Sequence, residues 1–292
     1  MRTYLDCYPC MLGQAVDAAR MTGASEELQR SALREVLEIL KDMPSLSKPP
    51  EIGHKVHRIV RARTGDPDPY REAKAQSTHE ALELLPWMRH IVDGVPDPLE
   101  AAARLSIAGN IIDAIPGRQY NLRDEVRRVL DQPLAVGDVE ALRDSLREAD
   151  WVLYLADNAG ETVCDRPLIE AMALPVKYAV KGAPVANDAT MDDALAAGVD
   201  QSAEVVSTGS DAPGTLLETC SPAFQRLYAD APLIIAKGQA NYECLSEAGP
   251  RVFFLLQAKC PVLARDLNVL AGSTVLRQGG GFEERPLHGE EL

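Results

Sequence analysis

Five short apolar runs between residues 151 and 256 constrain the fold of this chain more than any other feature. Helix-compatible stretches separate them, at 162–173, 189–197, about 212–229 and 241–248. Continuous apolar strands that alternate with helices indicate a parallel sheet covered by helices on both faces. The five runs are WVLYLA (151–156), VKYAV (176–180), AEVV (203–206), PLIIA (232–236) and VFFLL (252–256).

The residues before about 150 predict helices instead. In the first of them apolar side chains recur on one stripe, and Ser25 is placed to cap it. Gly65 is a natural helix stop, whereas Pro86 predicts a break inside a longer helix. Pro98 stands where a further helix would begin. The expected helices cover 25–40, 54–65, 71–92 and 97–115.

This change of pattern divides the chain. We expect a helical domain at 1–148 and a doubly wound α/β domain at 149–280. The end of the chain, 281–292, has no apolar periodicity, so we expect it to be a flexible tail.

Composition limits the classes of partner. The 292 residues include 44 acidic and 30 basic side chains, which gives a formal net charge of −14. Such a balance argues against nucleic acid and against anionic membranes, since both attract clustered Lys and Arg. It leaves room for a small anionic substrate in a locally positive pocket. No apolar run approaches the length of a membrane span and no secretory signal opens the sequence, so we expect a cytoplasmic protein with reduced cysteines.

Three polar motifs follow the predicted strands directly. They are DNAGE (157–161), KGAPVANDAT (181–190) and KGQANYE (237–243). Ligands of open parallel sheets bind in the crevice beyond the carboxyl ends of the strands. The three motifs are therefore expected to line one site.

The residue types at these strand ends favour metal-assisted phosphoryl transfer. Asp157, Asn158 and Asp188 offer the hard oxygen ligands that Mg²⁺ or Mn²⁺ prefers. Two carboxylates in one crevice repel each other unless a cation lies between them. Lys237 could neutralise phosphate oxygens, and a glycine such as Gly238 lets backbone N–H groups approach an anion at a helix start.

Each motif taken alone has a simpler interpretation. Asp157 and Asp188 both precede predicted helices, and an acidic residue there is more often a helix cap than a metal ligand. Lys237 alone would be a solvated lysine at a strand end. The occurrence of all three motifs at the same predicted edge favours a site.

These residues also carry a family resemblance. TYLDCYPC, AGNIID, DNAGE, APVANDAT, KGQANYE and AKCPV, in this order, resemble the metal-dependent damage-control phosphatases, formerly a domain of unknown function, over residues 3 to 270. The Cys-x-x-Cys near the start is similar to the prokaryotic subgroup. The resemblance implies a helical N-terminal domain on a three-layer α/β/α Rossmann-like domain with a mainly parallel sheet.

The resemblance also implies roles for particular residues. The enzyme would be a divalent-metal phosphatase, with Mg²⁺, Mn²⁺, Ni²⁺ or Co²⁺ as the cation, that acts on small phosphorylated metabolites such as sugar phosphates or damaged cofactor intermediates. The family's metal ligands correspond to Asp157, Asn158 and Asp188, and its phosphate-contacting lysine to Lys237. The corresponding substrate-pocket residues are Asn110, Glu161 and Asn241. One departure is Ala240, where the family pattern predicts a glycine.

Three other functions compete with this one. A haloacid-dehalogenase-like phosphatase needs Asp-x-Asp-x-Thr/Val early in the sheet, and DNAGE does not supply it. A nucleotide- or S-adenosylmethionine-binding module needs Gly-x-Gly-x-x-Gly after the first strand, and this motif is absent from the sequence. A metal or redox carrier would be centred on Cys7 and Cys10, but no second Cys-x-x-Cys completes a zinc site. We expect these two cysteines to be buried, unreactive thiols, and His54 and His57 to lie at a surface or an interface. The sequence sets no oligomeric state, and we expect part of the pocket wall to come from residues near Asn110 and from 68–70.

Overall fold

The central element of the fold is a single mixed sheet. The structure is a computed structural model that describes residues 1–44, 46–110 and 121–280. Among these residues seven strands form the sheet in the order β1-β7-β6-β5-β2-β3-β4, and every neighbouring pair is parallel except β6 and β7. The predicted, mainly parallel sheet is confirmed. The strands are β1 (Val136–Gly137), β2 (Val152–Leu155), β3 (Val176–Val180), β4 (Glu204–Ser207), β5 (Leu233–Lys237), β6 (Val252–Gln257) and β7 (Thr274–Gln278).

Helices cover both faces of this sheet, as predicted. Tyr154 and Phe253 contribute to a core with α4, α5 and α8, whereas their sequence neighbours Leu153 and Phe254 contribute to a core with α10, α11 and α12. This alternation follows from the two-residue repeat of side chains along a strand. The helices are α1 (Cys7–Met21), α2 (Glu26–Lys41), α3 (Pro49–Thr64), α4 (Arg71–Asp93), α5 (Pro98–Gly109), α6 (Leu122–Asp131), α7 (Val139–Glu148), α8 (Glu161–Met172), α9 (Met191–Ala196), α10 (Pro222–Asp230), α11 (Gly238–Leu245) and α12 (Pro261–Leu267), with 3₁₀ turns at Val199–Gln201 and Leu217–Thr219.

Local sequence signals explain several helix ends and fail at one. Ser25 caps α2, since its side chain accepts a hydrogen bond from the Leu28 N–H at 3.4 Å. Gly65 ends α3 in the left-handed conformation with φ 77°, as predicted. The predicted break at Pro86 is wrong, because α4 continues through it to Asp93. Pro86 is on the exposed face, where water can satisfy the carbonyl that its missing N–H leaves free, while the opposite face of α4 packs on α8.

A second prediction needs correction. The helix-compatible stretch at about 212–229 is helical only in part, in the 3₁₀ turn at Leu217–Thr219 and in α10. Gly214 has φ +63°, and Ser221 begins α10 by accepting a hydrogen bond from the Phe224 N–H at 3.2 Å. The early part of this stretch is therefore a loop, and it lies at the carboxyl edge of the sheet.

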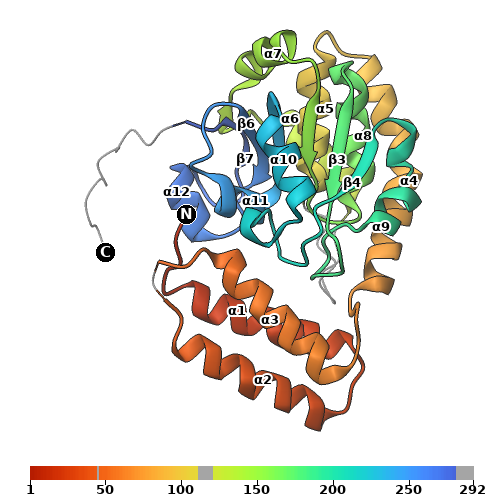
Figure 1. Cartoon of the computed structure of the whole chain (residues 1–292). Helices are drawn as coiled ribbons and strands as arrows, with labels where there is room; N and C mark the ends of the chain where they lie inside the picture. Colours follow the sequence, from red (N-terminus) through yellow and green to blue (C-terminus); the bar gives the residue numbers. More distant parts are fainter. Residues whose placement is uncertain (45, 111–120, 281–292) are drawn as a thin grey trace.

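The first three helices form a small bundle with a core of its own, built by Ala15, Ala18, Val36 and Val56 among others. Figure 1 shows this bundle beneath the α/β body, next to α11. The helices α4 and α5 precede the predicted boundary at 148, yet they pack on the sheet, so the main core crosses that boundary. The predicted tail at 281–292 lies outside the described residues. Within the described ranges, none of the helices has the length and apolar character needed to cross a membrane.

Candidate active site

The candidate site lies at the topological switch point of the sheet, between the neighbouring strands β2 and β5. The strands β2 and β5 are parallel neighbours, but the chain continues from β2 to β3 on one side and returns to β5 on the other. Such a switch point opens a crevice at the carboxyl ends of the two strands. Asp157 follows β2 by two residues, and Gly238 follows β5 immediately.

Backbone pairing joins the first two motifs. Asn158 and Asp188 form an isolated antiparallel bridge. On either side of it, the Ala159 N–H donates to the Asn187 carbonyl at 2.9 Å and the Ala189 N–H donates to the Asp157 carbonyl at 2.8 Å. The structure thereby brings together the three residues predicted to bind a cation, and all three are buried.

The environment of the two carboxylates of this group, Asp157 and Asp188, disfavours their charged form. Burial raises the pKa of Asp157 well above its usual value, and the nearby carboxylates of Glu161 and Asp188 raise it further. Burial also raises the pKa of Asp188, although Lys181 opposes the shift from 3.3 Å away. Asp188 Oδ2 accepts no hydrogen bond from any described residue.

These features fit a hard divalent cation. Such ions are often bound through one or two carboxylates, with other oxygen ligands completing the shell. Among the described residues, no group of three or more His, Cys, Asp or Glu side chains is arranged so that it could hold a metal ion. The candidate set instead combines two carboxylates with one carboxamide. Lys181 is a cation beside Asp188, yet the pKa values of both carboxylates stay raised, which a further positive charge would correct.

Glu161 fixes the orientation of the carboxamides. It is fully buried, and its Oε1 accepts hydrogen bonds from Asn158 Nδ2 and, at 2.8 Å, from Asn110 Nδ2. Asn110 Nδ2 also donates to Asp157 Oδ2 at 2.9 Å. Because the nitrogen of Asn158 is turned towards Glu161, its carbonyl oxygen is left to bind a cation. Both oxygens of Glu161 are engaged, since Oε2 lies 2.9 Å from Lys237 Nζ.

Lys237 is bound by two buried carboxylates. Its ammonium lies 2.9 Å from Glu161 and 3.0 Å from Asp165, and all three side chains are fully buried. Burial alone would lower the pKa of Lys237, but the charges of Asp165 and Glu161 outweigh it and the pKa is raised. Asp165 also accepts hydrogen bonds from Ser106 and from Tyr178, each at 2.7 Å.

Asp165 and Lys181 are the functional candidates that the sequence interpretation missed. The only signal for Asp165 was its spacing of four residues from Glu161 on one helix, which places both side chains on the same face. Lys181 was part of a quoted motif, directly after β3, but it was not given a role.

Asn241 and Gly238 shape the backbone. Asn241 Nδ2 donates to the Ala156 carbonyl at 3.1 Å and to the Lys237 carbonyl at 2.8 Å, so it ties the end of β2 to the end of β5. Its Oδ1 accepts from Thr215 at 2.7 Å. At Gly238 the φ is +77°, and a Cβ there would lie 1.8 Å from Asp157 Oδ2. Ala240 lies within α11, where an alanine is readily accommodated.

Cys7, Cys10, His54 and His57 lie apart from this cluster in sequence, and one prediction about them is wrong. Cys7 is buried, as expected, but Cys10 is exposed. Burial raises the pKa of the Cys7 thiol. His54 lies at the interface between the bundle and the α/β body, where its Nε2 is 2.7 Å from Asp211 Oδ1, and His57 is buried.

The matching family model is described as the damage-control phosphatase ARMT1-like domain, and it covers residues 3–275. A damage-control phosphatase of Archaeoglobus fulgidus is 34% identical over 282 residues, which are 93% of this chain and 97% of that protein. A second damage-control phosphatase, from Pyrococcus horikoshii, is 33% identical over 286 residues, or 94% and 97% of the two chains. An uncharacterized protein of Methanocaldococcus jannaschii is 34% identical over 284 residues, 93% of each chain.

The fold has a similar counterpart among solved structures. The crystal structure of a DUF89 family protein from Pyrococcus horikoshii matches with a TM-score of 0.88 and 31% sequence identity. The match covers 96% of this chain and 99% of that one. The likeness therefore includes the helical bundle as well as the sheet.

Proposed function

This chain belongs to the ARMT1-like damage-control phosphatase family, and from that premise we propose that it is a divalent-metal-dependent phosphatase of small phosphorylated metabolites. The proposal assigns Asp157, Asn158 and Asp188 as the cation ligands. The observation that carries it is the bridge between Asn158 and Asp188, which gathers two buried carboxylates and one oriented carboxamide at the switch point of the sheet.

The proposed cation would stabilise negative charge on the phosphoryl group. When bound at these ligands, a divalent cation supplies positive charge to the phosphoryl oxygens. The side chains of this protein prepare that position: Glu161 turns the amide of Asn158, and Asn110 holds Asp157 Oδ2. Because these groups are already oriented by buried hydrogen bonds, little reorganisation is needed during the reaction.

The surroundings of the ligands favour a phosphate. The helices α8 and α11 both begin at this edge, and the amino ends of helices attract anions. Lys181, 3.3 Å from Asp188 Oδ2, adds a positive charge on the side of the 181–190 loop. The contact between Lys237 and the substrate phosphate, implied by the resemblance, stays a prediction, because the Lys237 ammonium is bound to Glu161 and Asp165 in the structure.

The test is the substitution Asp157→Asn, which keeps the shape of the side chain and removes its charge. If Asp157 binds the cation, Mn²⁺-dependent hydrolysis of a generic phosphate ester should fall about 10³-fold or more. The protein without metal should be as stable as the parent or more stable, because a buried carboxylate with a raised pKa has been removed. Thermal unfolding in the presence of a chelator and steady-state kinetics measure the two effects.

A matched control is Asp97→Ala, at a helix cap. Asp97 Oδ1 accepts a hydrogen bond from the Glu100 N–H at 3.1 Å and begins α5. Its loss should cost about 1 kcal/mol of stability and leave the activity largely unchanged. If Asp157→Asn behaves like this control, destabilised but active, Asp157 is a structural residue and the proposed metal site is wrong.

A further inference from the structure

Lys74 is a buried lysine outside the candidate site. It lies on α4, its side chain is only 2% exposed, and its ammonium is placed between two carboxylates. The distances are 2.9 Å to Asp68 Oδ2 and 2.9 Å to Asp193 Oδ2. Burying a charged side chain costs free energy, and a buried ion pair often adds little net stability. Stability alone is therefore a weak explanation for this arrangement.

Asp193 connects Lys74 to the loop that carries Asp188, residues 181–190. Asp193 Oδ2 accepts hydrogen bonds from the Thr190 N–H at 2.9 Å and from the Thr190 hydroxyl at 2.6 Å, which forms a capping box at the start of α9. Thr190 in turn pairs with Lys181 at the other end of the loop. One carboxylate oxygen thus holds both Lys74 and the base of the 181–190 loop.

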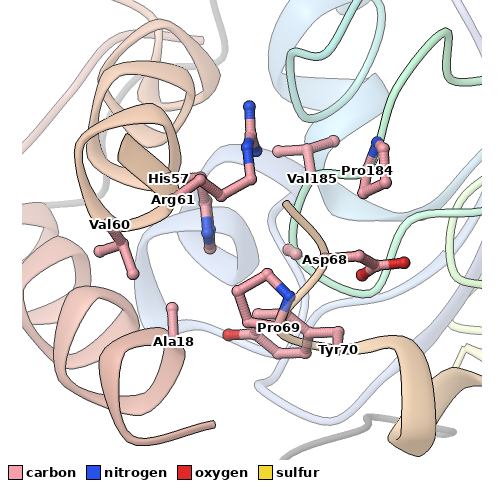
Figure 2. A pocket seen from close by; sticks show the side chains of 10 residues that line it. Ala18, His57, Val60, Arg61, Asp68, Pro69, Tyr70, Pro184 and Val185 are labelled. Carbon is pink, nitrogen blue, oxygen red and sulfur yellow. The ribbon is translucent and has the colours of Figure 1, made fainter. Parts of the chain in front are cut away.

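Asp68 binds Lys74 from the segment that leads into α4. Figure 2 shows Asp68 beside Pro184 and Val185, which lie in the middle of the 181–190 loop. The segment 68–70, expected from the sequence to form part of the pocket wall, lines a narrow pocket together with these loop residues. Lys74 is therefore the ion-pair partner that this segment shares with the start of α9, directly after the loop.

The position of Asp188 depends on the shape of this loop. The Asp188 N–H donates to the Val185 carbonyl at 3.1 Å. Burial raises the pKa of Asp188, whereas the charges of Lys181 and, less strongly, of Lys74 lower it, so Lys74 is close enough to act on this carboxylate. A change at Lys74 can thus affect the proposed ligand in two ways, through the backbone of the loop and through charge.

These two effects have opposite signs. Lys74 is a positive charge near a site for a cation, so by charge alone its removal would tighten cation binding. Without Lys74, however, the largely buried carboxylates of Asp68 and Asp193 would have no cation between them, and their repulsion would displace the loop. Outer partners that orient metal ligands commonly contribute about 10- to 100-fold to metal affinity. The direction of the change in affinity therefore shows which effect dominates.

We propose that Lys74 is a positioning residue of the cation site, which joins α4 and the segment before it to the 181–190 loop and thereby places Asp188 for the cation. The proposal rests on the cation ligands assigned with the proposed phosphatase function. It gives the helical part of the chain a role in metal affinity.

The decisive variant is Lys74→Met, which keeps an unbranched side chain of similar length and removes the charge. Calorimetric titration of the full chain with Mn²⁺, without substrate, should show about tenfold weaker binding, whereas charge alone predicts tighter binding. Hydrolysis of a generic phosphate ester should fall at limiting Mn²⁺. At saturating Mn²⁺ it should return to within about threefold of the parent, because the ligands themselves are intact.

A second variant keeps the test decisive if Lys74→Met does not fold. Lys74→Met combined with Asp68→Asn removes one charge of each sign, so the net charge is unchanged and the two carboxylates no longer repel each other. This variant still lacks the link to the loop, so it should bind Mn²⁺ about tenfold more weakly than the parent. Hydrogen–deuterium exchange should speed up in 182–190, while the strand β2 stays protected.

The matched control is Lys48→Met. Lys48 also joins the helical part of the chain to the α/β body, since its Nζ donates to the Cys244 carbonyl at 2.8 Å. Its partner lies on α11 and not on the 181–190 loop. Mn²⁺ affinity should therefore stay within about twofold of the parent. A loss as large as that of Lys74→Met would overturn the proposal, because any loosening of the helical part would then weaken the site.

The binding data also separate this proposal from the proposed function. Unchanged or tighter Mn²⁺ binding in both Lys74 variants would overturn the positioning role, and hydrolysis by the parent would still support the phosphatase. Weaker binding in both variants, together with a parent that binds Mn²⁺ but hydrolyses no phosphate ester, would support the positioning role and refute the phosphatase. A parent that binds no Mn²⁺ would refute both.

Discussion

At the scale of single residues, Gly238 lets the backbone pass close to the side chain of Asp157, a proposed cation ligand. Its φ is +77°, and a Cβ there would lie 1.8 Å from Asp157 Oδ2. Gly238→Ala should therefore displace the proposed ligand as well as strain the backbone, and we expect a loss of Mn²⁺-dependent activity of about 10²-fold or more. The control is Gly249→Ala, where φ is +85° but no atom lies within 4 Å of the added Cβ. It should cost about 1–2 kcal/mol in thermal unfolding and leave the activity intact. Equal activity in the two variants would contradict the proposed position of Asp157.

The candidate ligands could be predicted from the sequence, but their supporting network could not. Asp157 stands directly after an apolar run, Asp188 lies in the motif 181–190 that follows the next one, and the carboxyl ends of parallel strands share one edge. Asp165 gave no such signal, because its role depends on Lys237, 72 residues further along the chain, and on Ser106 from α5. A buried ion pair forms through tertiary contacts, so a single sequence does not indicate which charged side chains will pair.

A second prediction at this scale concerns Glu243 and pH. Burial raises the pKa of Glu243 to about 7, although Gln239 Nε2 donates to it at 2.7 Å. Between the ordinary glutamate pKa of 4.5 and pH 7 the folded state keeps a proton that the unfolded state releases, so stability falls as pH rises through this window. Glu243→Gln should thus exceed the parent in unfolding free energy by about 2–3 kcal/mol at pH 8, with little difference at pH 4. Urea unfolding at pH 4, 6 and 8 measures this, and a difference independent of pH would disprove the assignment.

At the scale of elements, the sequence predicted the strands that are mostly apolar and missed two that are not. The five predicted strands all form, with ends that differ from the prediction by at most one residue. The strand β7 (TVLRQ) ends in polar residues, and β1 has only two residues, so neither has the apolar pattern of a buried parallel strand. β7 is also the antiparallel member of the sheet, and its burial falls along the strand: Thr274–Leu276 are buried, whereas Arg277 and Gln278 are half-buried. The helix α4 shows the opposite case, because packing on α8 maintains it through an exposed Pro86 that local propensity marks as a break.

At the scale of the whole molecule, the bundle of α1–α3 is attached to the loops at the carboxyl edge of the sheet. The attachment is polar: Asp211, in the loop after β4, lies 2.6 Å from Arg61 and 2.7 Å from His54, and Lys48 Nζ donates to the Cys244 carbonyl at 2.8 Å. The apolar cores of the bundle and of the sheet are separate clusters. Ion pairs at a partly buried interface are weaker than a shared core, so we expect the bundle to detach from the sheet more easily than either part unfolds.

The last prediction tests that attachment through Asp211→Asn. Burial alone would raise the pKa of Asp211, but the hydrogen bond from His54 and the charges of His54 and Arg61 lower it, so the side chain is ionised at pH 7 and binds both partners. This contribution is present above the unfolded pKa near 3.8 and is lost as pH falls through the lowered folded value. Without the charge, hydrogen–deuterium exchange at pH 7 should speed up by about tenfold in α3 and in 208–216, and the strands β2 and β5 should stay protected. The control is Glu35→Gln, which removes an ion pair with Arg63 inside the bundle and should leave 208–216 unchanged. Exchange in Asp211→Asn that rises equally in the sheet would show that bundle and sheet unfold as one unit, which would contradict a separate, polar attachment of the bundle.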